Sequence, residues 1–282
     1  MKKTALFIVM LLIGGCQTLN DLANQVKKPT LSIEDVRVTG FSFNELSLVY
    51  DIKVDNPNAA SITMTGYDYR FDINGSEFLT GKHDRKVAIN SKGENIVEVP
   101  VTVNFSRLYR AIEGIVKNDE SDYRFLSTLR FDLPALGQTN IPVQKQGNIP
   151  MVKMPTVSMK DISVESLSLS GAELAVDFRI DNPNGFGMEF NTLDYNLKIN
   201  SDRWASGTAM QGTWVKANAV SELRIPISLD IGQVGMSAYR LLSGSGSVNY
   251  RVDGNISVNA LHELLGTADI AFDRSGSISI NR

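Results

Sequence analysis

The sequence predicts an all-β protein made of two tandem antiparallel β-sandwiches of the immunoglobulin or fibronectin-III shape, each with one short α-helix. Three observations predict this fold. The chain repeats itself at an offset of 126 residues, which places Pro29 on Pro155. Each copy alternates apolar and polar residues with a period of two, and each copy contains one short segment with helical spacing.

The repeat aligns Pro29–Phe105 with Pro155–Ile231 without a gap. The longest shared block is Asp55-Asn56-Pro57-Asn58 over Asp181-Asn182-Pro183-Asn184. A repeat of this length indicates a duplicated domain. We therefore expect a first domain at residues 29–150 and a second at residues 151–282, joined by a short linker around residues 147–154 that two prolines stiffen.

The hydrophobic period predicts the elements within each copy. Every second residue from Leu46 to Val54 is apolar, and the second copy keeps the same phase from Ala172 to Ile180. This alternation is typical of a half-buried strand, and it recurs at residues 67–73 and 97–103. One segment per copy changes period: residues 108, 112, 115 and 116, and residues 234, 238, 241 and 242, have the spacing of a short amphipathic helix.

The N-terminus has the features of an export signal. Lys2 and Lys3 precede an apolar run, Ala5–Ile13, which is far shorter than the roughly 20 residues that cross a bilayer as a helix. Gly14-Gly15-Cys16 then resembles a bacterial lipobox, in which the cysteine thiol is acylated after cleavage. We expect a signal peptide at residues 1–15 and an acylated tether at residues 16–28. The alternative is an ordinary secretory signal with an incidental cysteine.

The same residues predict where the protein is held and what it does not bind. Acyl chains on Cys16 would attach it to a membrane, and Gln17 favours the outer membrane, facing the periplasm, in a Gram-negative source. Removing Lys2 and Lys3 changes the net charge from −3 to −5, which gives no basic excess for nucleic acid. With one cysteine, the mature chain has no intramolecular disulfide and no thiolate metal site.

No group of residues has the spacing of a catalytic, cofactor or metal site. His83 and His262 occupy non-equivalent positions in the two copies and belong to no recognised motif. Asp51 and Asp55 share a face, but about 13 Å of strand would separate them, which is too far for one calcium ion. Trp214 is a candidate exposed contact residue, whereas Trp204, which replaces Phe78, is expected in the core.

The Asn-Pro-Asn motif ends a core strand in each copy. Proline cannot donate to a strand ladder, and asparagine side chains commonly bond the backbone of their own turn, so we interpret Asn56-Pro57-Asn58 and Asn182-Pro183-Asn184 as structural turns. With a domain of this length and one late helix, the motif resembles the LEA type 2 family, also called the water stress and hypersensitive response (WHy) domain. The resemblance covers residues 29–282. It implies a folded β-sandwich with one helix, an association with desiccation stress that is often at membranes, and no catalytic residues.

The sequence therefore predicts a non-enzymatic, membrane-anchored envelope lipoprotein with a desiccation-protective or binding role. Two alternatives stay open. A groove between sandwich and helix would bind a lipid or another apolar ligand, or the second domain would act as an envelope scaffold that docks a protein partner through Trp214.

Overall fold

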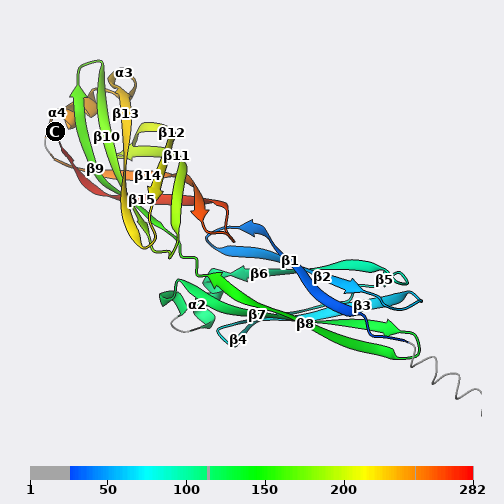
Figure 1. Cartoon of the computed structure of the whole chain (residues 1–282). Helices are drawn as coiled ribbons and strands as arrows, with labels where there is room; N and C mark the ends of the chain where they lie inside the picture. Colours follow the sequence, from blue (N-terminus) through cyan, green and yellow to red (C-terminus); the bar gives the residue numbers. More distant parts are fainter. Residues whose placement is uncertain (1–25, 113–114, 245, 282) are drawn as a thin grey trace, which may run out of the picture.

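The computed structural model describes residues 26–112, 115–244 and 246–281, and it confirms an all-β chain with a few short helices (Figure 1). The signal peptide, Cys16 and nearly all of the tether lie outside the described residues, so their assignments stay predictions. Within the described part of the chain, no helix is long and apolar enough to cross a membrane. The two copies lie end to end in Figure 1.

The first copy is a sandwich of two antiparallel sheets. One sheet has the order β1-β2-β6 and contains β1 (Thr30–Phe41), β2 (Glu45–Asp55) and β6 (Glu94–Asn104). The other has the order β4-β3-β7-β8, with a fifth strand also on β3, and contains β3 (Ile62–Ile73), β4 (Ser76–His83), β5 (Val87–Ile89), β7 (Glu120–Leu133) and β8 (Gly137–Pro150). Between β6 and β7 lie helix α2 (Phe105–Ala111) and the 3-10 helix η1 (Ile115–Lys117).

The second copy has its strands in one continuous order, β12-β11-β14-β15-β9-β10-β13. The strands are β9 (Thr156–Leu167), β10 (Gly171–Asn182), β11 (Gly187–Ile199), β12 (Asp202–Val215), β13 (Ala219–Asp230), β14 (Ser247–Leu261) and β15 (Thr267–Asn281). Strand β15 joins the two halves, because it pairs antiparallel with β14 and, at its end, parallel with β9 through Ile280 and Ile162. The sandwich is therefore closed along one side and has the edges β12 and β13 along the other.

The buried strands follow the predicted alternation. In β2, all the even-numbered residues from Leu46 to Val54 are buried, and β10 buries the even-numbered residues from Ala172 to Ile180. Trp204 is 6% exposed and belongs to the core, as predicted. Asparagine 104 and aspartate 230 cap the helices that follow β6 and β13, because their side chains accept hydrogen bonds from backbone N–H groups of the first turn.

The helical segments differ from the prediction. In the first copy the helix ends at Ala111, Ile112 is its C-cap, and Ile115 opens the separate 3-10 helix. In the second copy there are two helices, α3 (Ile231–Val234) and α4 (Met236–Ser243), instead of one. Gly235 separates them because its φ of 98° lies in the region that favours glycine and cannot continue a helix.

The junction between the copies also differs from the prediction. Strand β8 continues to Pro150, so the linker is shorter than expected, at residues 151–155. The acidic run 119–122 leads into β7. The Asp119 carbonyl accepts a hydrogen bond from the Met151 N–H, and the Asp119 carboxylate accepts one from Asn218 of the second copy (3.3 Å). Lys153 Nζ lies 3.6 Å from the same carboxylate. Asp119 therefore links the two copies.

Candidate functional site

The two Asn-Pro-Asn motifs occupy equivalent positions at the ends of β2 and β10. All four asparagines are buried, although asparagine is a polar residue. Buried amides are expected to be hydrogen-bonded, since an unpaired one has a large desolvation cost.

The first asparagine of each motif binds backbone on both sides of its turn. Asn56 Nδ2 donates to the carbonyls of Ala60 and Asn90, both at 2.9 Å. Asn182 Nδ2 donates in the same way to the carbonyls of Phe186 (2.8 Å) and Lys216 (3.0 Å). Each of these side chains therefore ties the end of its core strand to the loop that precedes β6 or β13.

The second asparagine binds the chain that leads into its own domain. Asn58 Nδ2 donates to the Lys27 carbonyl and Asn58 Oδ1 accepts from the Lys27 N–H, both at 2.8 Å. Asn184 makes the same two bonds to Lys153, at 2.9 and 2.6 Å. We call these two arrangements, Asn58 with Lys27 and Asn184 with Lys153, the asparagine clamps. The first clamp holds the chain just before it enters the first domain, and the second clamp holds the linker between the copies.

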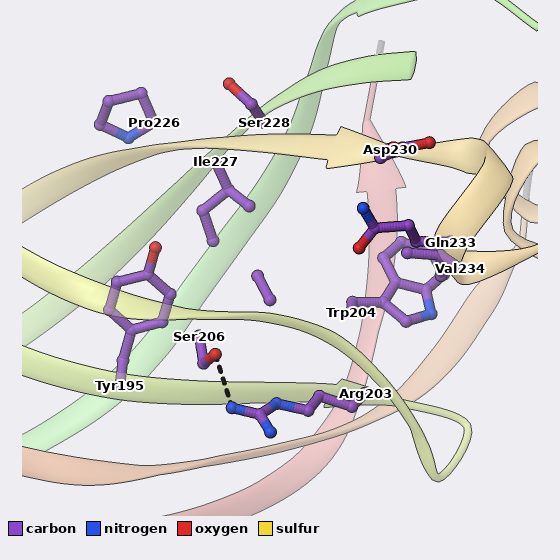
Figure 2. A pocket seen from close by; sticks show the side chains of 11 residues that line it. Tyr195, Arg203, Trp204, Ser206, Pro226, Ile227, Ser228, Asp230, Gln233 and Val234 are labelled. Atoms are coloured by element: carbon purple, nitrogen blue, oxygen red, sulfur yellow. Dashed lines mark hydrogen bonds between the residues drawn. The ribbon is translucent and has the colours of Figure 1, made fainter. Parts of the chain in front are cut away.

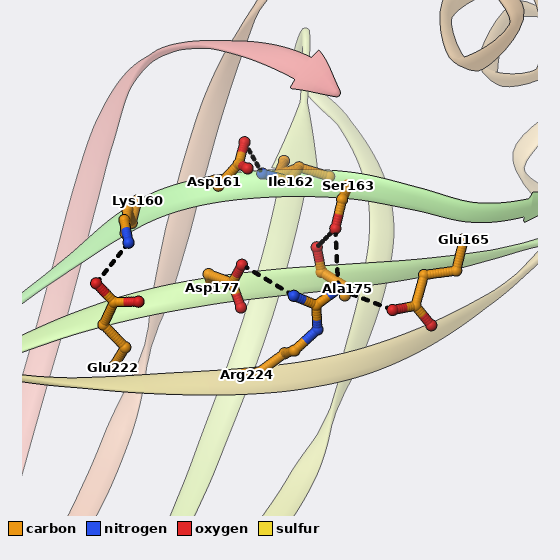
Figure 3. Close-up of polar contacts among 9 residues, drawn as sticks. All are labelled: Lys160, Asp161, Ile162, Ser163, Glu165, Ala175, Asp177, Glu222 and Arg224. Atoms are coloured by element: carbon orange, nitrogen blue, oxygen red, sulfur yellow. Dashed lines mark hydrogen bonds and ion pairs between the residues drawn. The ribbon is translucent and has the colours of Figure 1, made fainter. Parts of the chain in front are cut away.

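An ion-pair ladder crosses the outer face of each copy. In the second copy, Arg224 on β13 lies 3.4 Å from Asp177 on β10 and 2.8 Å from Glu165 on β9 (Figure 3). Lys160 and Glu222 form a further pair between β9 and β13. Arg224 therefore bridges carboxylates on the other two strands.

The first copy has the same ladder with its cation on the opposite strand. Arg37 on β1 lies 2.6 Å from Asp51 on β2 and 2.7 Å from Glu98 on β6. Asp51 aligns with Asp177, so the central carboxylate is shared and the arginine approaches from the other side. The hydrogen bond from Arg37 lowers the pKa of Asp51, and the bonds to Asp51 and Glu98 raise the pKa of Arg37. The ladder stabilises both charges at neutral pH.

A pocket of about 540 Å³ opens between β12 and β13, the two edges of the second copy (Figure 2). Most of its labelled residues are polar, and within it Arg203 donates to Ser206 Oγ (2.6 Å). Its lining comes from β11 and β12 on one side and from β13 and α3 on the other: Tyr195, Arg203, Trp204, Ala205, Ser206, Pro226, Ile227, Ser228, Asp230, Gln233 and Val234. This lining suits polar groups better than an acyl chain.

A smaller pocket of about 350 Å³ lies at the junction of the copies. Its floor includes Val36, Leu46, Leu48 and Ile149 of the first copy, and Leu264 of the second copy lies at it as well. The pocket occurs between β1 and β8, which do not pair with each other, whereas the corresponding strands of the second copy do pair.

The remaining residues that the sequence singled out are dispersed. His83 is exposed with its ring 5.1 Å from that of Tyr67, and His262 Nδ1 accepts from the Leu264 N–H in the second copy. Trp214 is 60% exposed near the end of β12. Among residues 26–112, 115–244 and 246–281, no three histidine, cysteine or acidic side chains gather as metal ligands would.

Comparison with known proteins finds similarity in both copies. The family model described as late embryogenesis abundant protein (LEA_2) matches residues 51–147 and 177–276. The late embryogenesis abundant protein Lea14-A of Gossypium hirsutum is 28% identical over 138 residues, which is 49% of this chain and 89% of that protein. The desiccation protectant protein Lea14 homolog of Glycine max is 28% identical over 131 residues, 46% of this chain and 84% of its own. A solution structure from Arabidopsis thaliana is 26% identical with a TM-score of 0.37, covering 44% of this chain and 83% of its own.

Proposed function

We propose that this chain, which belongs to the LEA_2 family of late embryogenesis abundant proteins, is a non-enzymatic lipoprotein that protects the cell envelope against desiccation. The family matches fall on both copies, and the matched relatives carry names that refer to late embryogenesis and desiccation. These matches support a stress-protective role in general terms. We further propose that the chain is not an enzyme, that it resides in the cell envelope and that a lipid anchors it there. The observation that carries it is the presence of two family domains in one chain.

The fold supports protection because most of its polar backbone groups bond within the chain and its outer faces carry ion pairs. The backbone groups of the strands pair with one another, and apolar side chains fill the core of each sandwich. The ion-pair ladders on the outer faces, such as Arg37 with Asp51, contribute little in dilute solution because water screens them. As water is removed, the surrounding dielectric constant falls and the same attraction becomes stronger. The domains are therefore expected to stay folded while less stable neighbours unfold.

The first asparagine clamp sets the distance between the proposed anchor and the first domain. Acylated Cys16 would hold the chain at a membrane, in a Gram-negative source the outer membrane from its periplasmic side. The bonds between Asn58 and Lys27 then fix the point at which the tether leaves the domain. Only residues 17–26 lie between that point and the acylated cysteine, so the first domain would stay close to the lipid surface.

The proposal is tested in a strain that lacks the gene. Survival after drying is compared among strains that express the whole chain, the Cys16→Ser variant or neither. We expect the whole chain to restore survival and to fractionate with membranes, and Cys16→Ser to be released from them. If the whole chain gives no better survival than the empty strain, the stress role is wrong. If Cys16→Ser still fractionates with membranes, the anchor assignment is wrong.

A second candidate, binding of an apolar ligand, is favoured by the junction pocket. Leu46, Leu48 and Leu264 contribute apolar surface there, with polar groups around them. Native mass spectrometry of the whole protein, extracted gently from membranes, would detect a bound lipid as added mass. An apo mass under every gentle condition would exclude this candidate.

A further inference from the structure

We propose that strand β12 binds an extended segment of another polypeptide by strand addition, and that the pocket beside β12 receives side chains of that segment. This inference does not depend on the desiccation role. It rests on the unprotected edge of β12, on the register of that strand and on the pocket between β12 and β13.

Strand β12 is an edge strand because its ladder partner is β11 and it ends the sheet order. An edge exposes N–H and C=O groups that another strand can pair with, so natural proteins protect edges with charged residues and proline. Between Trp204 and Val215 there is neither a charged residue nor a proline.

The other edges of the two copies are protected. The edge strand β5 has only three residues, and short edges pair poorly. The others contain charged residues, proline or both: β1 has Glu34, Asp35 and Arg37, β4 has Glu77 and Lys82, β6 has Glu98 and Pro100, β8 has Pro142 and Lys145, and β13 has Glu222, Arg224 and Pro226. The duplication supplies a direct comparison. Strand β4 aligns with the first part of β12, and where β12 has Thr208, β4 has Lys82; the charged run 84–86 aligns with the uncharged residues 210–212.

The central part of β12 has the regular geometry that strand pairing needs. Residues Ala205–Met210 oppose Leu197–Thr192 one to one, and register shifts occur only on either side of this run. Six residues at about 3.4 Å each give an edge of about 20 Å. The two irregularities limit the length of the segment that can pair, which protects the protein from open-ended association.

The side chains on the core side of this run leave room for a bound segment. Ala205 and Ala209 oppose the buried Leu197 and Leu193, which places them on the core side of the sheet, and Gly207 lies between them. Ala205 leaves space toward β13 because its side chain is small, whereas the Tyr195 ring covers Gly207. The pocket lies in that space, with Ile227 of β13 on its far side (Figure 2).

The chemistry of the groove specifies its occupant. Main-chain groups of β12 would pair with a polypeptide in extended conformation, as in other cases of strand addition. The pocket offers hydroxyl, amide and guanidinium groups from Ser206, Gln233 and Arg203, which favour polar side chains on the segment. We therefore assign as occupant an extended, uncharged polypeptide segment with serine, threonine or glutamine side chains.

The test uses the whole chain in detergent and a labelled synthetic peptide that copies residues 204–215, an uncharged segment of the required kind. Binding is measured by fluorescence anisotropy. In the protein variant, Ser206→Lys and Thr208→Lys place two positive charges on the edge; the matched control, Thr80→Lys, places the same residue at the aligned position of β4. We expect the double variant to weaken binding by at least about tenfold and the control to bind as the unmodified protein does.

A second measurement identifies the pairing itself. Two further peptides carry N-methyl groups on alternate amides. In one peptide the methylated amides lie along one edge of the extended strand, and in the other peptide they lie along the opposite edge. Strand addition uses one edge of the peptide, so we expect one set to lose binding and the other to retain it. Equal binding by both sets, or no binding at millimolar peptide, would overturn the proposal. A dimer of the chain that the double variant dissociates would overturn the assigned occupant, since a second copy would then cover the edge. Unchanged circular dichroism of the variants verifies that they are folded, and Thr208→Lys alone replaces the double variant if it is not.

Discussion

Replacing Asn184 by alanine is expected to destabilise the second copy by several kcal/mol while leaving the first copy unchanged. The side chain is fully buried and makes three hydrogen bonds: two to the backbone of Lys153 and one to Asn182 Oδ1. At about 1 kcal/mol for each bond, the free energy of unfolding should fall by about 3 kcal/mol. The Lys153 N–H and C=O lose these partners in the variant, which adds to the cost.

The tryptophans make the second copy separately observable. Trp204 and Trp214 both lie on β12, and the first copy has no tryptophan. Urea unfolding followed by tryptophan fluorescence therefore reports the second copy, whereas far-ultraviolet circular dichroism reports both. With a urea dependence of about 2 kcal/mol per molar, the fluorescence midpoint of Asn184→Ala should fall by about 1.5 M.

Asn58→Ala is the matched control, because it removes the equivalent clamp from the first copy. It should shift the circular dichroism transition and leave the tryptophan midpoint in place. A shift below about 0.5 kcal/mol in Asn184→Ala would refute the clamp, since ordinary surface substitutions have effects of that size.

The substitution Asn184→Asp should make the stability of the second copy depend on pH. The new carboxylate would face the Lys153 carbonyl and Asn182 Oδ1 where an N–H₂ group now donates, and burial together with these acceptors would raise its pKa. A raised pKa in the folded state stabilises the protein below the unfolded value of about 3.9, and that stability is lost as pH rises through the folded value. The deficit of this variant relative to the unmodified protein should therefore grow from acid to neutral pH. A pH-independent deficit would contradict this.

Three further predictions concern single side chains. The buried Tyr50 hydroxyl lies near Tyr123 but meets no partner in hydrogen-bond geometry, and burial raises its pKa, so Tyr50→Phe should increase the free energy of unfolding by about 1 kcal/mol in urea titrations; a decrease would show that the hydroxyl bonds to Tyr123. Trp204→Ala should cost about 3–5 kcal/mol by thermal or urea unfolding because Trp204 is a core residue, whereas the exposed Trp214→Ala should change stability by less than about 0.5 kcal/mol. Arg37 lowers the pKa of Asp51, so its contribution is present at neutral pH; Arg37→Ala should be slightly less stable than the unmodified protein at pH 7, and the difference should disappear as pH falls through the lowered pKa of Asp51.

The strands could be predicted because two patterns are visible in the sequence itself: the period-two alternation of apolar residues and the internal duplication. The burial of β2 and of Trp204 followed from them directly. The break at Gly235 was not predictable from apolar spacing, because that spacing says nothing about backbone dihedral angles. The bonds from Asn58 to Lys27 were missed for a different reason: they join residues 31 positions apart through main-chain groups, which have no sequence signature. The open edge of β12 was visible in the sequence as a run without charge, but it acquires meaning only once the sheet order identifies β12 as an edge.

The asparagine clamps have a mechanical consequence if the proposed anchor at Cys16 holds the protein by its N-terminus. Tension on the tether arrives at Lys27 and passes through the amide of Asn58 to the end of β2, which is the middle strand of its sheet. The edge strand β1 is thus bypassed, although peeling an edge strand one hydrogen bond at a time is the easy way to pull a sandwich apart. Tension that reaches the linker is passed from Lys153 through Asn184 to β10, which lies between β9 and β13. Stretching the chain therefore loads the central strands β2 and β10 before the edge strands of their sheets.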